Sequence, residues 1–285
     1  DINPQKKVHA LVIPKGEYKD LDDFNNKASD QEIIELSRAL THVANMLGAK
    51  DDNWINVFVL GNYGSTSDGK PVFPEFKDKI HVSETPLEPI RGIPIVLGWD
   101  FGLTPSCVIM QQTNRGQIQV LEEIVSEDMG IRQFASDIVK PILLNNYSGY
   151  TKVSTCDPSG NQRSQVDERS CVQELFEIGI PTEIADTNDW LPRREAVAFF
   201  LTRMNDGKPA FLLDKRCKVL RKGLNGKYQY QRLKVSGTAR YRDRPLKDDM
   251  SHIQDALQYA CLRVRSGLAR TRARAVLQRT AVGWT

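Results

Sequence analysis

The fold is decided by the stretch Ile93-Pro94-Ile95-Val96-Leu97-Gly98-Trp99-Asp100-Phe101-Gly102. Its apolar, β-branched run predicts a buried strand, and the residues after Asp100 predict a turn. A carboxylate at the end of a buried strand is costly unless a cation lies against it. A divalent metal ion is the simplest such cation, because hard cations bind carboxylate oxygens. The alternative is that Asp100 only begins the turn, and the rest of the chain decides between the two.

The elements expected after this strand indicate an α/β protein. Tight turns at Pro105 and at 114–116 separate three consecutive strands, over 93–100, 105–113 and 116–126. Similar patterns predict strands over 151–157, 180–185 and 209–213, and helices over 130–147, 166–179, 189–205, 215–222 and from about Ser251 to about Arg265. Three strands, a helix, a further strand and flanking helices are typical of a ribonuclease H-like mixed sheet.

An N-terminal helical and irregular extension is expected ahead of these elements. Residues 1–28 are polar and irregular, and Ser29-Asp30-Gln31-Glu32 fits a capping box. Apolar residues at helical spacing then predict a helix from Ile33 to Leu47, which Gly48 ends.

Composition limits the class of protein. At 285 residues the chain can bury a sizeable core, and no apolar run approaches the ~20 residues of a membrane span. Its five cysteines are widely spaced, which disfavours a disulfide framework or a zinc site and favours reduced thiols in a cytoplasm. The net charge is only +3, yet residues 215–247 are rich in lysine and arginine against one acid, Asp243. This asymmetry suggests a polyanionic partner.

Two carboxylates follow apolar strands in the same way. Asp100 and Asp157 both close a predicted strand, and both precede turn residues. If the two strands are parallel neighbours, the carboxylates meet at the C-terminal edge of the sheet, where open α/β sheets place their sites. Two acids so close repel each other unless metal ions bridge them.

A third candidate is Asp255, within residues 248–259 of the last predicted helix. His252 and Asp255 are three residues apart and share a face of this helix. That face lies off the centre of the apolar stripe, which is formed by Ile253, Ala256, Leu257, Ala260, Cys261 and Val264. The alternative is that Asp255 is a solvated helix carboxylate and His252 a residue near a cap.

Three motifs in order resemble the nuclease domain of tailed-bacteriophage terminase large subunits. They are residues 98–105 (Gly-Trp-Asp-Phe-Gly-Leu-Thr-Pro), residues 157–160 (Asp-Pro-Ser-Gly) and residues 251–259 (Ser-His-Ile-Gln-Asp-Ala-Leu-Gln-Tyr). Residues 54–76, above all 69–76, are similar to the stretch that joins the ATPase domain of that family to its nuclease. The resemblance covers residues 51–265.

The resemblance implies a DNA endonuclease of a viral packaging motor, which cuts concatemeric DNA in the cytoplasm of an infected bacterium. It implies a hydrolase of phosphodiester bonds that uses two Mg²⁺ or Mn²⁺ ions. The matching motifs place the metal ligands on Asp100, Asp157 and Asp255, and His252 matches a histidine found near the third acid in part of the family. The implied partners are double-stranded DNA and, in the full motor, the portal and the small terminase subunit, with no membrane.

The same resemblance suggests how the chain is divided. Residues 1–90 are expected to be the end of the ATPase domain plus a linker, 91–265 the nuclease domain, and 266–285 a basic tail. The phosphate-binding pattern G-x-x-x-x-G-K-[ST] is missing, so ATP turnover by this chain is not expected. The chain is therefore expected to be a C-terminal fragment of a longer protein.

The basic segment 215–247, which carries Tyr228, Tyr230 and Tyr241, predicts the surface that binds DNA. Lysine and arginine neutralise phosphates without reading sequence, so this binding is expected to weaken steeply with salt. A solvated loop is the alternative for this segment. Lys247, like His252, is also a candidate for supporting charge or orienting water. The predicted DNA-binding residues are Lys222, Lys227, Arg232, Lys234, Arg240, Arg242, Arg244 and Lys247.

Two other functions compete with the nuclease. Residues 100–106 resemble the first phosphate loop of actin-like ATPases, although the sequence lacks the second glycine-rich turn that such enzymes need. The chain is otherwise a non-catalytic DNA-binding or docking module of the packaging motor, in which the acids are structural.

Overall fold

The computed structural model describes residues 69–102, 104–161, 169–233 and 240–281, with the last helix given as backbone alone from residue 268. The chain forms two compact units, Asp1–Ser67 and Asp68–Thr285, and all described residues belong to the second. The predicted helix from Ile33 to Leu47 and the start of the connector at 54–68 lie outside the described residues, as does Lys234.

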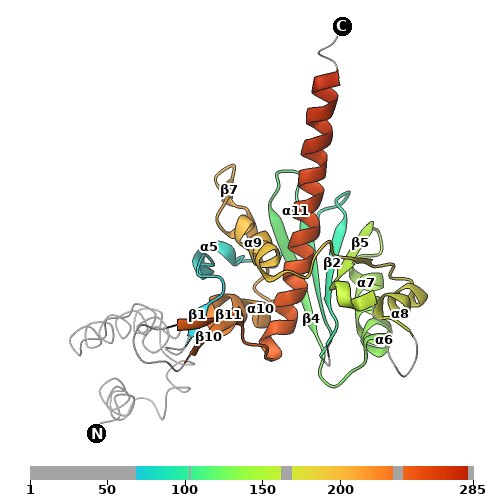
Figure 1. The fold of residues 1–285 in the computed structure, drawn as a ribbon. Coiled ribbons are helices and arrows are strands. Elements are labelled where there is room, and N and C mark those ends of the chain that lie inside the picture. Colours follow the sequence, from blue (N-terminus) through green and yellow to red (C-terminus); the bar gives the residue numbers. More distant parts are fainter. Residues whose placement is uncertain (1–68, 103, 162–168, 234–239, 282–285) are drawn as a thin grey trace, which may run out of the picture. The chain divides into compact units, whose positions relative to one another are not determined.

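A six-stranded mixed sheet forms the centre of this unit, in the order β6-β5-β2-β3-β4-β9 (Figure 1). Strands β2, β3 and β4 form an antiparallel meander, while β5 pairs with β2 in parallel, and β6 and β9 lie parallel to their neighbours. This order confirms the predicted ribonuclease H-like sheet. The strands are β2 (Ile95–Asp100), β3 (Ser106–Gln112), β4 (Ile118–Val125), β5 (Lys152–Cys156), β6 (Glu183–Ile184) and β9 (Phe211–Leu213).

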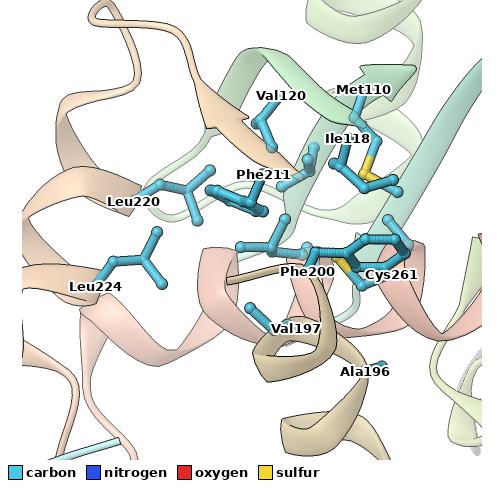
Figure 2. Packing of buried hydrophobic residues seen from close by; sticks show 14 of the residues in the cluster. Met110, Ile118, Val120, Ala196, Val197, Phe200, Phe211, Leu220, Leu224 and Cys261 are labelled. Carbon is cyan, nitrogen blue, oxygen red and sulfur yellow. The ribbon is translucent and has the colours of Figure 1, made fainter. Parts of the chain in front are cut away.

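Helices cover both faces of the sheet, and each face has its own core. On one face the core includes residues of α9 (Trp190–Leu201), α10 (Lys218–Lys222) and α11 (Asp249–Ala281), where the sheet residues Met110, Ile118 and Phe211 lie close to Val197 and Cys261 (Figure 2). On the other face the core includes residues of the continuous helix 131–146 and of α8 (Cys171–Ile178). The helix over 131–146 consists of α6 (Ile131–Gln133), the π-helix η2 (Phe134–Val139) and α7 (Lys140–Asn146).

Strand β2 divides its side chains between these two cores. Ile95, Leu97 and Trp99 belong to the core under α8, whereas Val96 belongs to the core under α11. Because side chains alternate along a strand, Asp100 shares the α11 face with Val96.

Gly98 lies on the α11 face as well, and it allows the helix to contact the strand. A Cβ at Gly98 would lie 2.2 Å from the carbonyl oxygen of Ala256 and 2.7 Å from the Cβ of Ala260. The missing side chain therefore lets the backbone of α11 approach the strand two residues before Asp100.

A second, three-stranded antiparallel sheet contains β1 (Gly69–Pro71), β10 (Gln229–Leu233) and β11 (Arg240–Pro245). Strands β10 and β11 pair antiparallel, so part of the basic segment 215–247 forms a hairpin. Val72, Phe73 and Phe76, just after β1, belong to the core under α11. The remaining elements are α5 (Asp78–His81), η3 (Pro158–Asn161), η4 (Gly223–Lys227) and the strand pair β7 (Met204–Asn205) and β8 (Lys208–Pro209).

The C-terminal ends of two predicted helices are wrong. The helix expected over 189–205 stops at Leu201, because the β7–β8 hairpin follows, with Asp206 and Gly207 at positive φ in its turn. The helix expected to end near Arg265 continues to Ala281. Residues 266–281 contain no proline and are rich in alanine, arginine and leucine, which are strong helix formers, so one glycine does not stop the helix. None of the described helices is both long and apolar enough to cross a membrane.

Candidate active site

Asp100 and Asp157 lie side by side at one edge of the sheet. Strands β2 and β5 pair in parallel with Trp99 opposite Cys156. The next residue along each chain segment is an aspartate, because Asp100 ends β2 and Asp157 directly follows β5. The prediction that the two strands are parallel neighbours is confirmed. Asp100 is only 7% exposed, whereas Asp157 is half-buried. Gly160 helps to bring the two turns together, because a Cβ there would lie 2.5 Å from the ring of Phe101.

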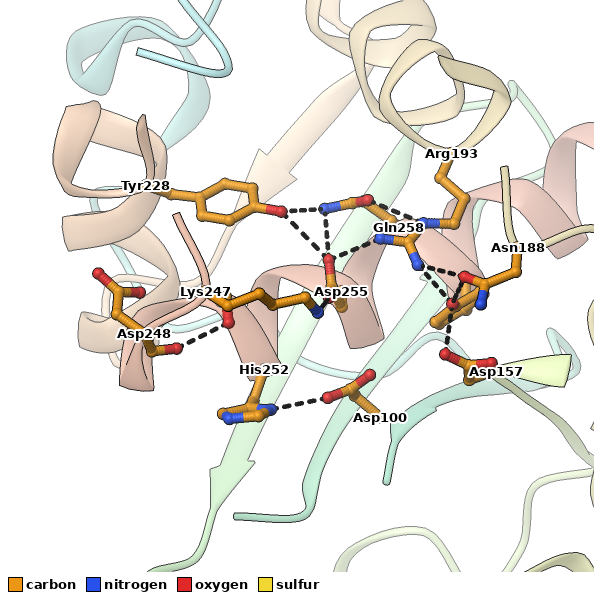
Figure 3. A network of polar contacts seen from close by, with 12 residues as sticks. Asp100, Asp157, Asn188, Arg193, Tyr228, Lys247, Asp248, His252, Asp255 and Gln258 are labelled. Carbon is orange, nitrogen blue, oxygen red and sulfur yellow. Dashed lines mark hydrogen bonds and ion pairs between the residues drawn. The ribbon is translucent and has the colours of Figure 1, made fainter. Parts of the chain in front are cut away.

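Asp100 is held by His252 from the first turns of α11. The Nδ1 atom of His252 lies 2.9 Å from Oδ2 of Asp100 (Figure 3). Burial raises the pKa of the Asp100 carboxyl, although the hydrogen bond from His252 opposes this shift. The same hydrogen bond raises the pKa of His252 against the opposing effect of burial. The structure therefore brings these two candidate site residues into direct contact.

Asp255 is fully buried, with 0% exposure, which excludes the solvated helix carboxylate. Its Oδ1 atom accepts hydrogen bonds from Arg193 at 2.8 Å and from Tyr228 and Gln258, both at 3.2 Å. Its Oδ2 atom accepts from the ammonium group of Lys247. Two cations and two neutral donors therefore surround this carboxylate (Figure 3).

Asp157 is oriented by the chain on both sides. Its Oδ1 atom accepts from the backbone N–H of Ser159 at 2.7 Å, and its Oδ2 atom lies 2.8 Å from the hydroxyl of Tyr259. The Tyr259 hydroxyl also lies 2.7 Å from Oδ1 of Asn188, so its single proton serves one acceptor at a time. Burial raises the pKa of Tyr259, which keeps the hydroxyl protonated.

Arg193 was missed by the sequence analysis, which assigned helix 189–205 no chemical role. It is 6% exposed and donates to Asp255, to Asn188 at 2.9 Å, to Gln258 at 3.2 Å and to the hydroxyl of Tyr259. Burial disfavours its charge, but the Asp255 carboxylate, together with Tyr259 and Tyr228, outweighs this effect and raises the pKa of Arg193. No signal in the sequence distinguishes this arginine from a solvated one.

The three predicted metal ligands share one edge of the sheet, but they do not surround one point. Among the residues that the structure describes, no group of three or more histidine, cysteine, aspartate and glutamate side chains is arranged to hold a metal ion. The ammonium group of Lys247 lies against Asp255 instead. The side chain of Lys247 is 67% exposed, so its stem is open to solvent while its ammonium group contacts the buried carboxylate. The metal-ligand assignment stays a prediction.

The basic hairpin ends at this same place. Lys247 follows β11 by two residues, and Tyr228 immediately precedes β10, yet both contact Asp255. The role expected for Tyr228 on the DNA-binding surface is wrong, because its ring is 2% exposed and packs against Trp190. The other described members of the predicted DNA-binding set are exposed: Lys222, Lys227, Arg232, Arg240, Arg242, Arg244 and Lys247.

Comparison by sequence assigns no family to the chain. No family model matches it. An uncharacterized 13.2 kDa HIT-like protein of Azospirillum brasilense is 50% identical over 54 residues, which are 19% of this chain and 44% of that protein. An uncharacterized HIT-like protein of Rickettsia prowazekii is 46% identical over 48 residues, which are 17% of this chain and 40% of that protein. The chain thus spans less than half the length of either relative.

Comparison by structure gives a clearer result. The nuclease domain of the large terminase of bacteriophage P22 is similar with a TM-score of 0.51 at 12% identity, over 72% of this chain and 95% of that domain. A large terminase from a thermophilic bacteriophage gives a TM-score of 0.49 at 19% identity, over 84% of this chain and 53% of that protein, so the chain spans about half of its length. The described part of the chain therefore has a fold like that of a large-terminase nuclease domain.

Proposed function

We propose that the chain is the metal-dependent DNA endonuclease of a viral genome-packaging terminase, and that it cuts concatemeric DNA. The observation that carries the proposal is the arrangement at the C-terminal edge of β2 and β5. There Asp100 and Asp157 are neighbours, Asp255 faces the same edge from α11, and the basic hairpin ends beside them. The fold shared with the P22 nuclease domain supports the same conclusion.

The donor atoms at this edge suit a divalent metal ion, although binding would require the three carboxylates to converge. Carboxylate oxygens are the ligands that Mg²⁺ and Mn²⁺ prefer, and Asp100, Asp157 and Asp255 would supply them. Two such ions, when bound, activate a water molecule and stabilise the leaving 3′ oxygen of the cut strand. The chain's own part is to keep the carboxylates oriented. His252 holds Asp100, and Tyr259 holds Asp157.

The test is cleavage of supercoiled plasmid by the full chain. With Mn²⁺ or Mg²⁺ present, we expect conversion to nicked and linear DNA, and excess EDTA should stop the reaction, because the proposed mechanism depends on the bound ions. Gel electrophoresis follows the products. Cleavage that continues at full rate in EDTA would contradict the metal-dependent mechanism.

DNA binding is proposed to use the exposed arginines of β11. Replacing Arg240, Arg242 and Arg244 together by alanine should lower affinity for duplex DNA and reduce the slope of log K against log salt by up to about 3, if each arginine neutralises one phosphate. Fluorescence anisotropy at several salt concentrations measures both quantities.

The matched control removes three exposed cations near the opposite edge of the sheet. Lys152 begins β5, and Arg115 and Lys208 line one shallow depression near the start of β2. Their triple alanine variant changes net charge equally but should keep most of the salt dependence. Equal slopes for the two triple variants would remove the hairpin from the proposed DNA-binding surface.

A second candidate is a non-catalytic DNA-docking module with structural acids. The observation that favours it is that Lys247 and Arg193 already compensate the charge of Asp255. Mn²⁺ titration separates the two functions. If Asp157→Ala abolishes Mn²⁺ binding while the thermal midpoint is kept, the acids bind metal and the docking module is excluded.

The remaining assignments are part of the same proposal. Residues 1–90 would be the end of an ATPase domain with its linker, 91–265 the nuclease, and 266–285 a basic extension that contacts DNA or the motor. The portal and the small terminase subunit would be its partners in the full motor. The actin-like ATPase is not proposed, because the ring of His252 lies over Gly102, where a phosphate loop would need open space.

A further inference from the structure

We infer that Arg193 is a positioning residue that fixes Asp255 and, through Tyr259, Asp157 in the orientation needed to bind metal. This inference rests on the proposed function and adds a residue to it. Arg193 lies on α9, and its hydrogen bonds reach neither Asp100 nor Asp157 directly. Its action on Asp157 would therefore pass through another side chain.

The guanidinium of Arg193 serves two of the three acids. Its Nη2 atom donates to Oδ1 of Asp255 at 2.8 Å, and its Nη1 atom donates to the hydroxyl of Tyr259. That hydroxyl lies 2.8 Å from Oδ2 of Asp157. The planar fork of an arginine fixes both directions at once, which a single ammonium group cannot do.

Arg193 itself has little conformational freedom. Its side chain is 7% exposed, and its guanidinium carbon lies 4.7 Å from the ring centre of Tyr259 and 5.9 Å from that of Trp190. The Nε atom donates to Gln258 at 3.2 Å and Nη1 also donates to Asn188 at 2.9 Å. A support that is already ordered adds no entropic cost when the ligand binds.

Lys247 contacts the same carboxylate in a different way. Both cations contact Asp255, but Arg193 uses Oδ1 and is buried, whereas Lys247 uses Oδ2 and is 67% exposed. A metal ion at Oδ2 would take the place of the exposed lysine's ammonium group and leave the guanidinium in place. Without Arg193, Oδ1 of the fully buried Asp255 would keep only the neutral donors Tyr228 and Gln258, so its orientation would be less fixed.

The experiment measures Mn²⁺ binding to the full chain without DNA, by isothermal titration calorimetry. Arg193→Lys keeps the charge but not the fork, and should raise the half-saturating Mn²⁺ concentration at least about tenfold, within the range seen when residues that hold metal ligands are replaced. Cleavage at saturating Mn²⁺ should recover to within a few-fold of the wild type. Lys247→Met should shift half-saturation in the opposite direction.

The readout separates positioning from a purely structural role. If Arg193→Lys lowers the thermal midpoint but leaves the Mn²⁺ half-saturation unchanged, the inference is wrong. If that variant does not fold, Tyr259→Phe removes only the hydroxyl that links Arg193 to Asp157. An unchanged Mn²⁺ half-saturation in Tyr259→Phe would then overturn the inference.

The same titrations also separate this inference from the proposed function. A wild-type chain that binds no Mn²⁺ would defeat both. A wild-type chain that binds Mn²⁺, together with an Asp157→Ala variant that does not, would support the proposed function whatever Arg193→Lys does. Only the Arg193 and Tyr259 variants then decide the role of the guanidinium.

Discussion

Replacing Asp100 by asparagine is expected to lower Mn²⁺-dependent plasmid cleavage by more than about a hundredfold, because even residues that only hold metal ligands typically contribute 10–100-fold. Asparagine has nearly the shape of aspartate and keeps an oxygen that accepts from His252, which now lies 2.9 Å from the carboxylate. It lacks the negative charge that a divalent ion needs. The change therefore tests the ligand rather than the packing.

Stability should not fall with activity in Asp100→Asn. The carboxyl is 7% exposed, and burial raises its pKa above the ordinary 3.8. A raised pKa means that the stabilising contribution is present at low pH and is lost as the pH rises through the folded-state value. Asparagine does not ionise, so the free energy of unfolding at neutral pH should be unchanged or higher.

The control for this variant is Asp206→Asn, in the β7–β8 turn. Asp206 is exposed and pairs with Arg115 at 3.6 Å, away from the acidic edge. The Asp206→Asn variant should cleave plasmid DNA like the wild type. Timed plasmid assays at one Mn²⁺ concentration compare the three proteins, and chemical denaturation checks that each is folded. Substantial cleavage by Asp100→Asn would exclude Asp100 as a metal ligand.

The paired acids were predictable because each ends an apolar strand, and the two strands are parallel neighbours in register. The burial of Asp255 was not predictable, because a helical-wheel argument assumes that a helix has one packing face. Helix α11 is buried around its whole circumference here, and Gln254, Asp255 and Gln258 are all 0% exposed. The reason is that the sheet, α9 and the base of the basic hairpin all contribute to one core with α11.

Arg193, Tyr228 and Lys247 show what a sequence alone omits. An arginine on a helix and a tyrosine in a basic segment both suggest solvent exposure. Arg193 and Tyr228 are buried because Asp255, distant along the chain, provides an acceptor for each. Lys247 was predicted to support charge or orient water, but its contact with Asp255 depends on how β11 leads into α11. Such partnerships come from tertiary folding, which no local pattern records.

The largest loss of stability is expected from Gly98→Ala. The new Cβ would lie 2.2 Å from the backbone oxygen of Ala256, which cannot rotate away, and 2.7 Å from the Cβ of Ala260. Alanine should gain about 0.5–1 kcal/mol over glycine within a strand from backbone entropy. Overpacking a filled core typically costs 1–3 kcal/mol and occasionally more, so the clash should outweigh that gain. We expect a net loss of at least about 2 kcal/mol, at the upper end of this range because backbone must move.

Activity should fall with stability in Gly98→Ala, unlike in Asp100→Asn. Helix α11 carries both His252 and Asp255, so moving it away from β2 displaces these two side chains together. Gly149→Ala is the matched control, since a Cβ at Gly149 meets nothing within 4 Å. Its free energy of unfolding, measured by urea denaturation, should stay within about 0.5 kcal/mol of the wild type. If Gly98→Ala were equally neutral, the close contact between α11 and β2 would not be what holds the two side chains at the sheet edge.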